Sequence, residues 1–255
     1  MRDERADQLL DVKLGELRIR IKGTDGRRTM DEVFDDQTLM IIYDLMTNKV
    51  FDILDFPIST GKEGNVFRAN LEGGGYVAVK IFRTTNATFN TIQKYILGDP
   101  RFKGLHGNRR KMIYAWASKE FKNLSRMREH GIRCPEPIAC RKNVLVMSYI
   151  GTAARPAPML KEAIPKDPEK FLDDMLDQVR KVYVEAQLVH CDLSEYNILV
   201  QRQKGYLIDV GQAVTADQHN SPEYLRRDVT NLLRFFDKLG VKRDLEQSLS
   251  YVRGD

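Results

Sequence analysis

The pattern of apolar and polar positions differs between the two halves of the chain, and the first half is predicted to consist mainly of strands. Apolar residues at helical spacing predict one helix over 34–46 before the strands begin. The turn sequence Glu72-Gly-Gly-Gly75 lies between two short apolar runs and favours a hairpin. A second helix is predicted over 109–130, because Gly131 is a common residue after a helix end. The expected strands are 51–58, 65–71, 76–82, 138–141 and 144–149.

The second half of the chain is predicted to be mainly helical. The proline-rich segment 152–168 is expected to be a loop or linker. A long amphipathic helix follows, with apolar positions between 171 and 186 on one side. Short strands are expected near 188–190, 198–201 and 206–208, and two final helices near 222–239 and 245–252.

This order of elements predicts an α+β fold with two lobes joined by a hinge near 149–153. We expect an N-terminal extension and helix over 1–48 and an N-lobe over 49–150. Within the N-lobe, 84–108 is predicted to be a flexible insertion with a short helix near 89–97. A C-lobe is expected over 151–255.

Composition indicates an ordinary globular protein. The 255 residues are 42% hydrophobic and 30% charged, with no apolar run long enough to span a membrane. The charged N-terminus lacks the apolar core of a signal peptide. Three cysteines without C-x-x-C spacing favour a reducing compartment over disulfides or a zinc site. We therefore expect a cytoplasmic protein.

Positive charge is concentrated in one stretch. The formal net charge is +5, yet residues 94–128 contain ten Lys or Arg against only two acids, Asp99 and Glu120. This stretch is either a solvated helix face and loop, or a footprint for a phosphate backbone, most readily RNA. Composition does not choose between the two.

A glycine-containing turn between two predicted strands is the first candidate phosphate site. Its sequence, Ser59-Thr-Gly-Lys-Glu-Gly-Asn-Val66, fits the kinase pattern G-x-G-x-x-G-x-V with Ser in the first Gly position. The candidate ATP-contacting residues here are Ser59, Gly61, Lys62, Gly64 and Val66. The pattern is not a Walker A loop, because a strand rather than a helix follows it. An ordinary β-hairpin remains the alternative interpretation.

A lysine and a glutamate form the second candidate pair. Lys80 ends the apolar run Val77-Ala-Val, where an ammonium needs partners. It either snorkels from an edge strand or binds the α/β-phosphates of ATP and pairs with a Glu on a helix. Glu120 shares a helix face with Ile113, Trp116, Leu124 and Met127, so it lies in an apolar stripe. We predict a Lys80–Glu120 ion pair; the alternative is a structural glutamate.

The most informative motif is His190-Cys-Asp-Leu-Ser-Glu-Tyr-Asn197, followed twelve residues later by Asp209-Val-Gly211. An Asp beside an attacking hydroxyl can accept its proton, which predicts that role for Asp192. Amide and carboxylate oxygens are hard ligands, so Asn197 and Asp209 are candidate Mg²⁺ ligands on the β- and γ-phosphates. Both motifs occur in this order downstream of Lys80, which makes coincidence improbable.

The predicted strand 144–149 ends near the hinge and offers a place for the adenine. Met147 would line the pocket, with backbone contacts near Ser148 and Ile150. The end of an ordinary core strand is the alternative interpretation.

These motifs resemble the RIO family of atypical protein kinases. The resemblance rests on Ser59-Thr-Gly-Lys-Glu, the 190–197 motif and Ile208-Asp-Val-Gly-Gln212, and it favours the first subfamily. It implies a trimmed bilobal kinase fold with extra N-terminal helices and no activation segment. It also implies autophosphorylating kinase or ATPase activity with ATP and Mg²⁺ (Mn²⁺ as an alternative), and a role in maturation of the small ribosomal subunit and its rRNA.

The resemblance further implies that the metal-binding aspartate, here Asp209, can become an aspartyl-phosphate. The sequence departs from the family pattern at two places. Gly64 replaces a common Ala or Ser, which is expected only to loosen the loop. The 100–110 loop has no Ser or Thr, which argues against a phosphorylation site there.

Three functions compete at this point. The first is a serine/threonine kinase that phosphorylates itself or another protein. The second is an ATP-driven assembly factor whose hydrolysis times its release from a pre-ribosome, favoured by the absence of a peptide platform. The third, disfavoured by the two RIO-like motifs, is a small-molecule kinase.

Overall fold

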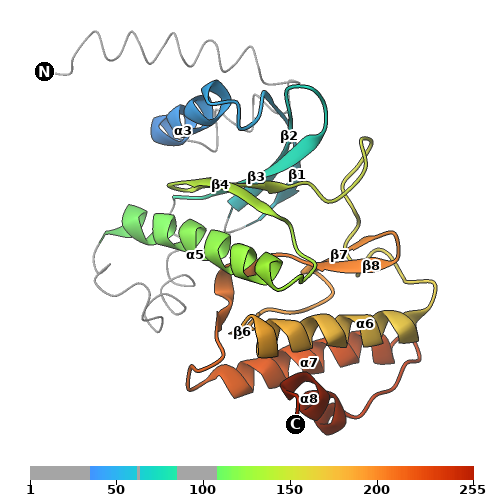
Figure 1. The fold of residues 1–255 in the computed structure, drawn as a ribbon. Coiled ribbons are helices and arrows are strands. Elements are labelled where there is room, and N and C mark those ends of the chain that lie inside the picture. The colour runs from blue at the N-terminus through green and yellow to red at the C-terminus, as the bar shows by residue number, and fades with distance from the viewer. Residues whose placement is uncertain (1–34, 62–63, 85–107) are drawn as a thin grey trace, which may run out of the picture. The chain divides into compact units, whose positions relative to one another are not determined.

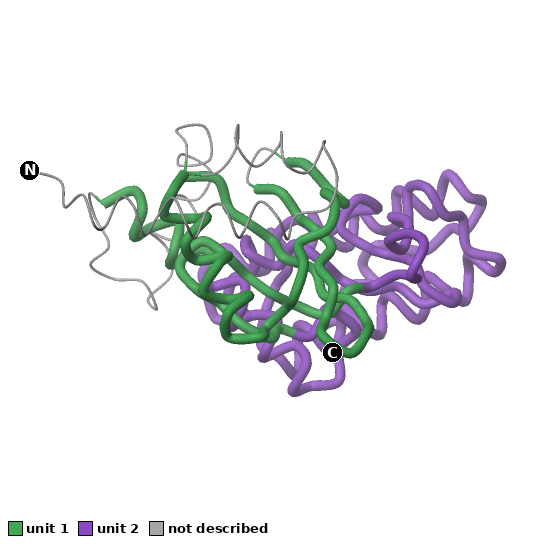
Figure 2. Tube along the Cα trace, turned by 90° about the horizontal axis from the view of Figure 1, so that it is seen from above, with its two compact units in different colours: residues 1–96, 102–118, 137–149 green, residues 97–101, 119–136, 150–255 purple. Residues whose placement is uncertain are grey.

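The computed structural model describes residues 35–61, 64–84 and 108–255 (Figure 1). These residues form two compact units (Figure 2). Among the described residues, unit 1 comprises 35–61, 64–84, 108–118 and 137–149, and unit 2 comprises 119–136 and 150–255. The predicted helix at 89–97, its following loop and Lys62 lie outside the described residues. No described helix is long and apolar enough to cross a bilayer.

Unit 1 is a five-stranded antiparallel sheet in the order β1-β2-β3-β5-β4. The predicted hairpin at 72–75 is confirmed, and Gly73, Gly74 and Gly75 all have positive φ there, which favours glycine. The strands are β1 (Ile53–Thr60), β2 (Gly64–Asn70), β3 (Tyr76–Phe82), β4 (Pro137–Arg141) and β5 (Val144–Ser148).

Helix α3 (Asp36–Thr47) covers one face of this sheet (Figure 1). Its buried residues Ile41, Ile42, Leu45 and Met46 pack with alternate residues of the strands, because successive strand side chains point to opposite faces. The strand residues in this core are Phe67, Ala69, Val77, Val79, Ile81, Val144 and Val146. The opposite face therefore carries the intervening positions, which include Arg68, Ala78, Lys80 and Met147.

A buried ion pair stabilises that opposite face. Arg68 Nε donates to Asp55 Oδ2 at 2.9 Å, and the guanidinium carbon lies 4.4 Å from the ring centroids of both Phe56 and Tyr76. Planar guanidinium groups suit such stacked, charge-paired positions. The cluster joins β1, β2 and β3 in the row in which Arg68 pairs with Ala78 and Ala78 with Met147.

Unit 2 contains helices and two short antiparallel strand pairs. Helix α6 (Pro168–Arg180) begins at the N-cap Asp167, whose side chain accepts from Lys170 N at 3.0 Å. The hairpin of β7 (Ile198–Gln201) and β8 (Lys204–Leu207) packs beside α6, and β6 (Leu188–Val189) pairs with β9 (Val214–Thr215). Helices α7 (Ser221–Asp237) and α8 (Leu245–Arg253) follow and pack against α6.

Helix α5 (Arg109–Glu129) contributes residues 109–118 to unit 1 and 119–129 to unit 2. Its predicted end is confirmed: Ile132 N bonds to Met127 O at 3.0 Å and Gly131 has φ of 65°.

Two elements differ from the sequence-based prediction. The helix expected over 171–186 is α-helical only to Arg180 and continues as a π-helical turn, Lys181–Glu185. Strand β9 was not predicted, because two residues are too few to show alternation.

Candidate active site

The β7–β8 hairpin places the two candidate metal ligands at its open end. Ile198 pairs with Leu207, and Ile208 N donates to Asn197 O at 3.0 Å. Asn197 therefore immediately precedes β7, and Asp209 follows one residue after the last hairpin hydrogen bond. The two candidate ligands are twelve residues apart in sequence, and the hairpin places them in neighbouring turns of the backbone.

Asp192 and Asn197 are directly hydrogen-bonded. Asn197 Nδ2 donates to Asp192 O at 2.7 Å and to Asp192 Oδ2 at 3.1 Å. Gln212 Nε2 donates to the same carboxylate oxygen at 3.4 Å. The amide nitrogen of Asn197 is thus turned toward Asp192, which leaves its carbonyl oxygen for other ligands.

Asp209 lies in a left-handed turn between β8 and the 3₁₀ helix η3 (Val210–Gln212). Its φ and ψ are 59° and 50°, a conformation that Asp tolerates better than most residues. Buried Asn123 of α5 supports this turn by donating to Val210 O at 2.8 Å and Ala213 O at 3.4 Å. His190 Nε2 donates to Ile208 O at 2.9 Å, which links the two motifs.

Helix α7 holds the loop that carries Asp192. The buried carboxylate of Asp228 accepts from Cys191 N at 2.8 Å and from Leu193 N at 3.1 Å. Arg227 donates to Cys191 O, and Asn231 Nδ2 donates to Leu193 O at 3.2 Å. Cys191 itself has φ of 67°, so the loop is fixed in an uncommon backbone conformation.

Sequence reasoning missed Asp228, Arg227 and Asn123. A signal for Asp228 existed, because it lies on the apolar face of α7 together with Leu225, Val229 and Leu232, which are all buried. A carboxylate in such a stripe indicates buried donors nearby.

The electrostatic environment raises the pKa of Asp192. Loss of hydration is the main cause and the nearby carboxylate of Asp209 adds to it. His190, the hydrogen bond from Asn197 and Arg227 act in the opposite direction but do not cancel the effect. A carboxyl group with a raised pKa is a stronger base once ionised, as a proton acceptor requires.

In unit 1, the glycine-containing turn joins β1 to β2. Ser59 and Gly61 are exposed, Ser59 pairs with Val66 across the strands, and Gly61 N donates to Gly64 O at 2.9 Å. A Cβ added at Gly64 would lie 2.5 Å from the backbone oxygen of Ile81. The expectation that Gly64 merely loosens the loop was therefore wrong: glycine permits the close approach of β2 to β3.

Lys80 is largely buried on the sheet face opposite α3. It pairs with Val66 on β2 and Leu145 on β5, and its Nζ lies 5.1 Å from the ring centroid of Phe82. Because β3 is flanked by β2 and β5, Lys80 is not on an edge strand.

Met147 continues the same face, one row along from Lys80. It is buried and pairs with Ala78, while Ser148 pairs with Val77. The carbonyl oxygen of Ile150, in unit 2, accepts from Ala157 N at 3.0 Å. The Ile150 carbonyl is therefore already engaged within unit 2.

Glu120 is buried in α5, as the apolar stripe predicted. Ile113, Trp116, Leu124 and Met127 share its face and are also buried. The adjacent Lys119 is fully buried as well, so it does not belong to an exposed basic surface.

These features define the protein-kinase-like fold class. They are a sheet of this strand order with a covering helix, a buried lysine on a strand, and a helical unit that carries the H-x-D and D-x-G turns. Solved structures agree. The Rio2 kinase–ADP/Mg²⁺–phosphoaspartate complex from Chaetomium thermophilum superimposes with a TM-score of 0.67 at 22% identity, covering 86% of this chain and 67% of that one.

The sequence matches the RIO domain family over residues 65–249, and the chain belongs to that family. It is 38% identical to the RIO-type serine/threonine-protein kinase Rio1 of Haloferax volcanii, over 99% of this chain and 88% of that protein. The Methanocaldococcus jannaschii Rio1 is 39% identical over 91% of this chain and 80% of that protein. The human serine/threonine-protein kinase RIO1 is 41% identical over 87% of this chain, which spans only 40% of the human protein. The chain is accordingly an enzyme of the atypical serine/threonine-kinase class.

Proposed function

We propose that this protein transfers the γ-phosphoryl group of ATP, with Asp192 as proton acceptor and Asn197 and Asp209 as ligands of Mg²⁺. The observation that carries the proposal is the bonded arrangement of Asp192 with Asn197 at the open end of the hairpin that leads to Asp209. Charge neutralisation and positioning dominate phosphoryl transfer, so few residues suffice.

The described residues fit a divalent cation by their chemistry. The Asn197 amide nitrogen is engaged by Asp192, which directs the hard carbonyl oxygen elsewhere, and Asp209 adds a carboxylate from the adjacent turn. When bound, Mg²⁺ would neutralise charge on the phosphates, and Mn²⁺ has similar ligand preferences. Asn197 also orients the Asp192 carboxylate toward an incoming hydroxyl.

The residues of unit 1 supply nucleotide binding in this proposal. Backbone N–H groups of the turn that includes Ser59, Gly61, Lys62 and Gly64 would contact the phosphates. Lys80 would contact the α- and β-phosphates and pair with Glu120. Val66 and Met147 would enclose the adenine, with Ser148 and Ile150 at its edge.

Substitution of the two aspartates tests the proposal. We expect Asp192→Ala and Asp209→Ala each to lower ATP turnover by at least about 100-fold while far-UV circular dichroism is unchanged. Asp217→Ala, an exposed aspartate in the same unit, is the matched control and should retain full turnover. Wild-type turnover by Asp209→Ala would refute the metal assignment.

An ATPase that drives small-subunit assembly is the second candidate function. Between Asp209 and the start of α7 at Ser221 the chain forms only η3, β9 and a short turn, so it builds no extended platform for a peptide there. In this version a carboxylate oxygen of Asp209 attacks the γ-phosphorus, the bond to ADP breaks, and water later hydrolyses the acyl-phosphate. The Chaetomium Rio2 complex, which contains a phosphoaspartate, supports that step by analogy.

Partners and location follow from the same proposal. The exposed cations of α5 and the family membership support binding to a small-subunit precursor or its rRNA in the cytoplasm. A small-molecule kinase is less well supported, because the Rio1 relatives are named protein kinases.

Single-turnover hydrolysis of ATP, with and without small ribosomal particles, separates the two candidates. Stimulation by particles, together with acid-stable but hydroxylamine-labile protein phosphate, would support the ATPase. Transfer of label to a serine or threonine of an added protein, without stimulation by particles, would support the protein kinase.

A further inference from the structure

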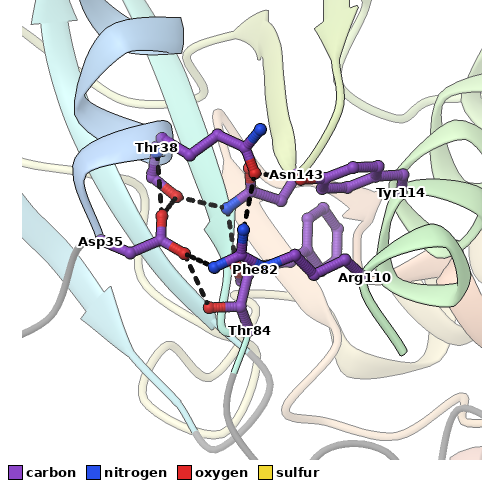
Figure 3. A network of polar contacts seen from close by, with 8 residues as sticks. Asp35, Thr38, Phe82, Thr84, Arg110, Tyr114 and Asn143 are labelled. Carbon is purple, nitrogen blue, oxygen red and sulfur yellow. Dashed lines mark hydrogen bonds and ion pairs between the residues drawn. The ribbon is translucent and has the colours of Figure 1, made fainter. Parts of the chain in front are cut away.

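A polar network joins the start of α3 to the start of α5 (Figure 3). Arg110 on α5 donates from one terminal nitrogen to Asp35 Oδ2 at 3.0 Å and from the other to Gln37 Oε1 at 3.0 Å. Tyr114, one turn further along α5, donates to the same Gln37 oxygen at 2.8 Å. The network lies entirely within unit 1.

The α3 side of this network is rigidly held. Asp35 is the N-cap of α3, and its Oδ1 accepts from Thr38 N at 2.9 Å and Thr38 Oγ1 at 2.7 Å. Buried Asn143, in the β4–β5 turn, donates to Thr38 Oγ1 at 3.0 Å and to Phe82 O at 3.1 Å. The acceptors that meet Arg110 are thus tied to the sheet by both the α3 core and this buried amide.

The charge state of Asp35 suits this role. Burial opposes ionisation, but the Thr38 hydrogen bonds and the Arg110 charge outweigh it, and the pKa of Asp35 is lowered. The carboxylate therefore stays ionised at neutral pH. A fork of two N–H donors across two acceptors also fixes the guanidinium in direction, which a single contact would not do.

We propose that Arg110, held by Asp35 and Gln37, is a positioning residue that sets α5 for phosphoryl transfer. The inference rests on the proposed function, in which Glu120 of the same helix pairs with Lys80. Helix α5 is continuous from Arg109 to Glu129, so a constraint on its first turns is transmitted along the axis to Glu120. Helix α3 would supply from within the chain the control of this helix that an activation segment supplies in ordinary kinases.

The expected effect is moderate, because the Arg110 and Asp35 side chains are 54% and 29% exposed. We expect Arg110→Met to lower kcat for ATP about three- to tenfold, with the KM for ATP changed less than about twofold. Arg110→Lys keeps the charge but loses the two-pronged contact, so it should restore activity only in part.

Two further variants separate positioning from simple helix stability. Asp35→Asn retains an N-cap residue of equal preference while removing the charge that faces Arg110, and it should reproduce the loss of kcat. Lys49→Met, which removes an exposed ion pair of unit 1 with Glu72 (3.0 Å), is the matched control and should leave kcat unchanged.

The decisive measurement is a double-mutant comparison with Glu120→Gln. If Arg110 acts through Glu120, adding Arg110→Met to Glu120→Gln causes no further loss of kcat. Multiplicative losses, or an equal loss in Lys49→Met, would overturn the inference.

Its failure can be distinguished from failure of the proposed function. Normal turnover by Glu120→Gln would refute the Lys80–Glu120 pair itself. Impaired turnover by Glu120→Gln together with normal turnover by Arg110→Met and Asp35→Asn would refute only the role of the network.

Discussion

Asp192 is only partly removed from water, yet its pKa is raised, and this has a measurable consequence. Only its ionised form can accept a proton, so kcat should fall on the acidic side as pH drops through its raised pKa. The acidic limb of the pH profile therefore lies above the ordinary value of 3.8 for Asp.

Arg227→Gln tests whether the charge of Arg227 affects the pH at which the acidic limb of the kcat profile lies. Arg227 lowers the Asp192 pKa by its charge, and Gln removes that charge while keeping a polar side chain. The variant should shift the acidic limb of kcat to higher pH, and water screening of the charge keeps that shift small. A shift to lower pH would contradict this assignment; Arg226→Gln, on the exposed side of the helix, is the control.

Gly64 provides a second prediction at the residue scale. Gly64→Ala would force the new Cβ against Ile81 O, and we expect it to lower the free energy of unfolding by about 1–3 kcal/mol. Gly61→Ala is the matched control, because its Cβ would lie at an ordinary 3.4 Å from Gly64 O. Denaturant unfolding measures both; equal stability of the two variants would contradict the packing explanation.

The burial of individual residues could be predicted from the sequence where a motif and the apolar pattern around it agree. Glu120 could be predicted as buried because its neighbours at helical spacing are apolar. Asp228 and Asn123 could not be assigned partners, because they bond to backbone groups of loops distant in sequence, and local patterns carry no such information.

At the scale of elements, α7 acts as the support of the loop that carries Asp192. Asp228→Ala would leave the Cys191 and Leu193 N–H groups without their acceptor in the interior. We expect a loss of about 2–4 kcal/mol in the free energy of unfolding, measured by denaturant titration.

The matched control is Asp237→Ala, an exposed aspartate at the end of the same helix, with an expected change within about 0.5 kcal/mol. Asp228→Asn, which keeps one acceptor oxygen, should fall between the two. Equal stability of Asp228→Ala and Asp237→Ala would show that the loop is held by other contacts.

Elements with several turns or alternations followed from the sequence, as the hairpin at 72–75 and the end of α5 near Gly131 illustrate. The π-helical turn at Lys181–Glu185 did not, because it has the same apolar spacing as the α-helix that it continues. Pattern alone fixes which residues face inward, but not small changes in helical hydrogen bonding.

At the scale of the whole molecule, the basic stretch is smaller than composition suggested. Lys119 is buried and Arg110 is engaged with Asp35 and Gln37. Lys111 and Lys122 remain exposed and share one face of α5, since eleven residues complete three helical turns. These two lysines form the testable part of the footprint.

Reversing both charges, Lys111→Glu with Lys122→Glu, should weaken binding to small-subunit rRNA. The slope of log K against log salt should flatten by about 1.4–1.8, since each of the two lost phosphate contacts removes about 0.7–0.9. Lys238→Glu with Lys242→Glu, exposed on unit 2, is the control of equal charge change. An unchanged slope in the α5 variant would show that these lysines are only solvent-exposed and do not bind RNA.

The turn between β7 and β8 has a consequence for how the chain tolerates changes of length. Arg202 and Gln203 both adopt positive φ, 50° and 62°, as a two-residue connection with the tight primed geometry requires. A deletion or insertion of one residue inside either strand would turn Asn197 or Asp209 to the opposite side of the ribbon, because side-chain direction alternates. Extra residues placed at 202–203 would instead extend the tip and spare both. Length changes should accordingly be tolerated only at the tip of the hairpin. No variant that retains turnover should have an interval shorter than twelve residues from the position of Asn197 to that of Asp209.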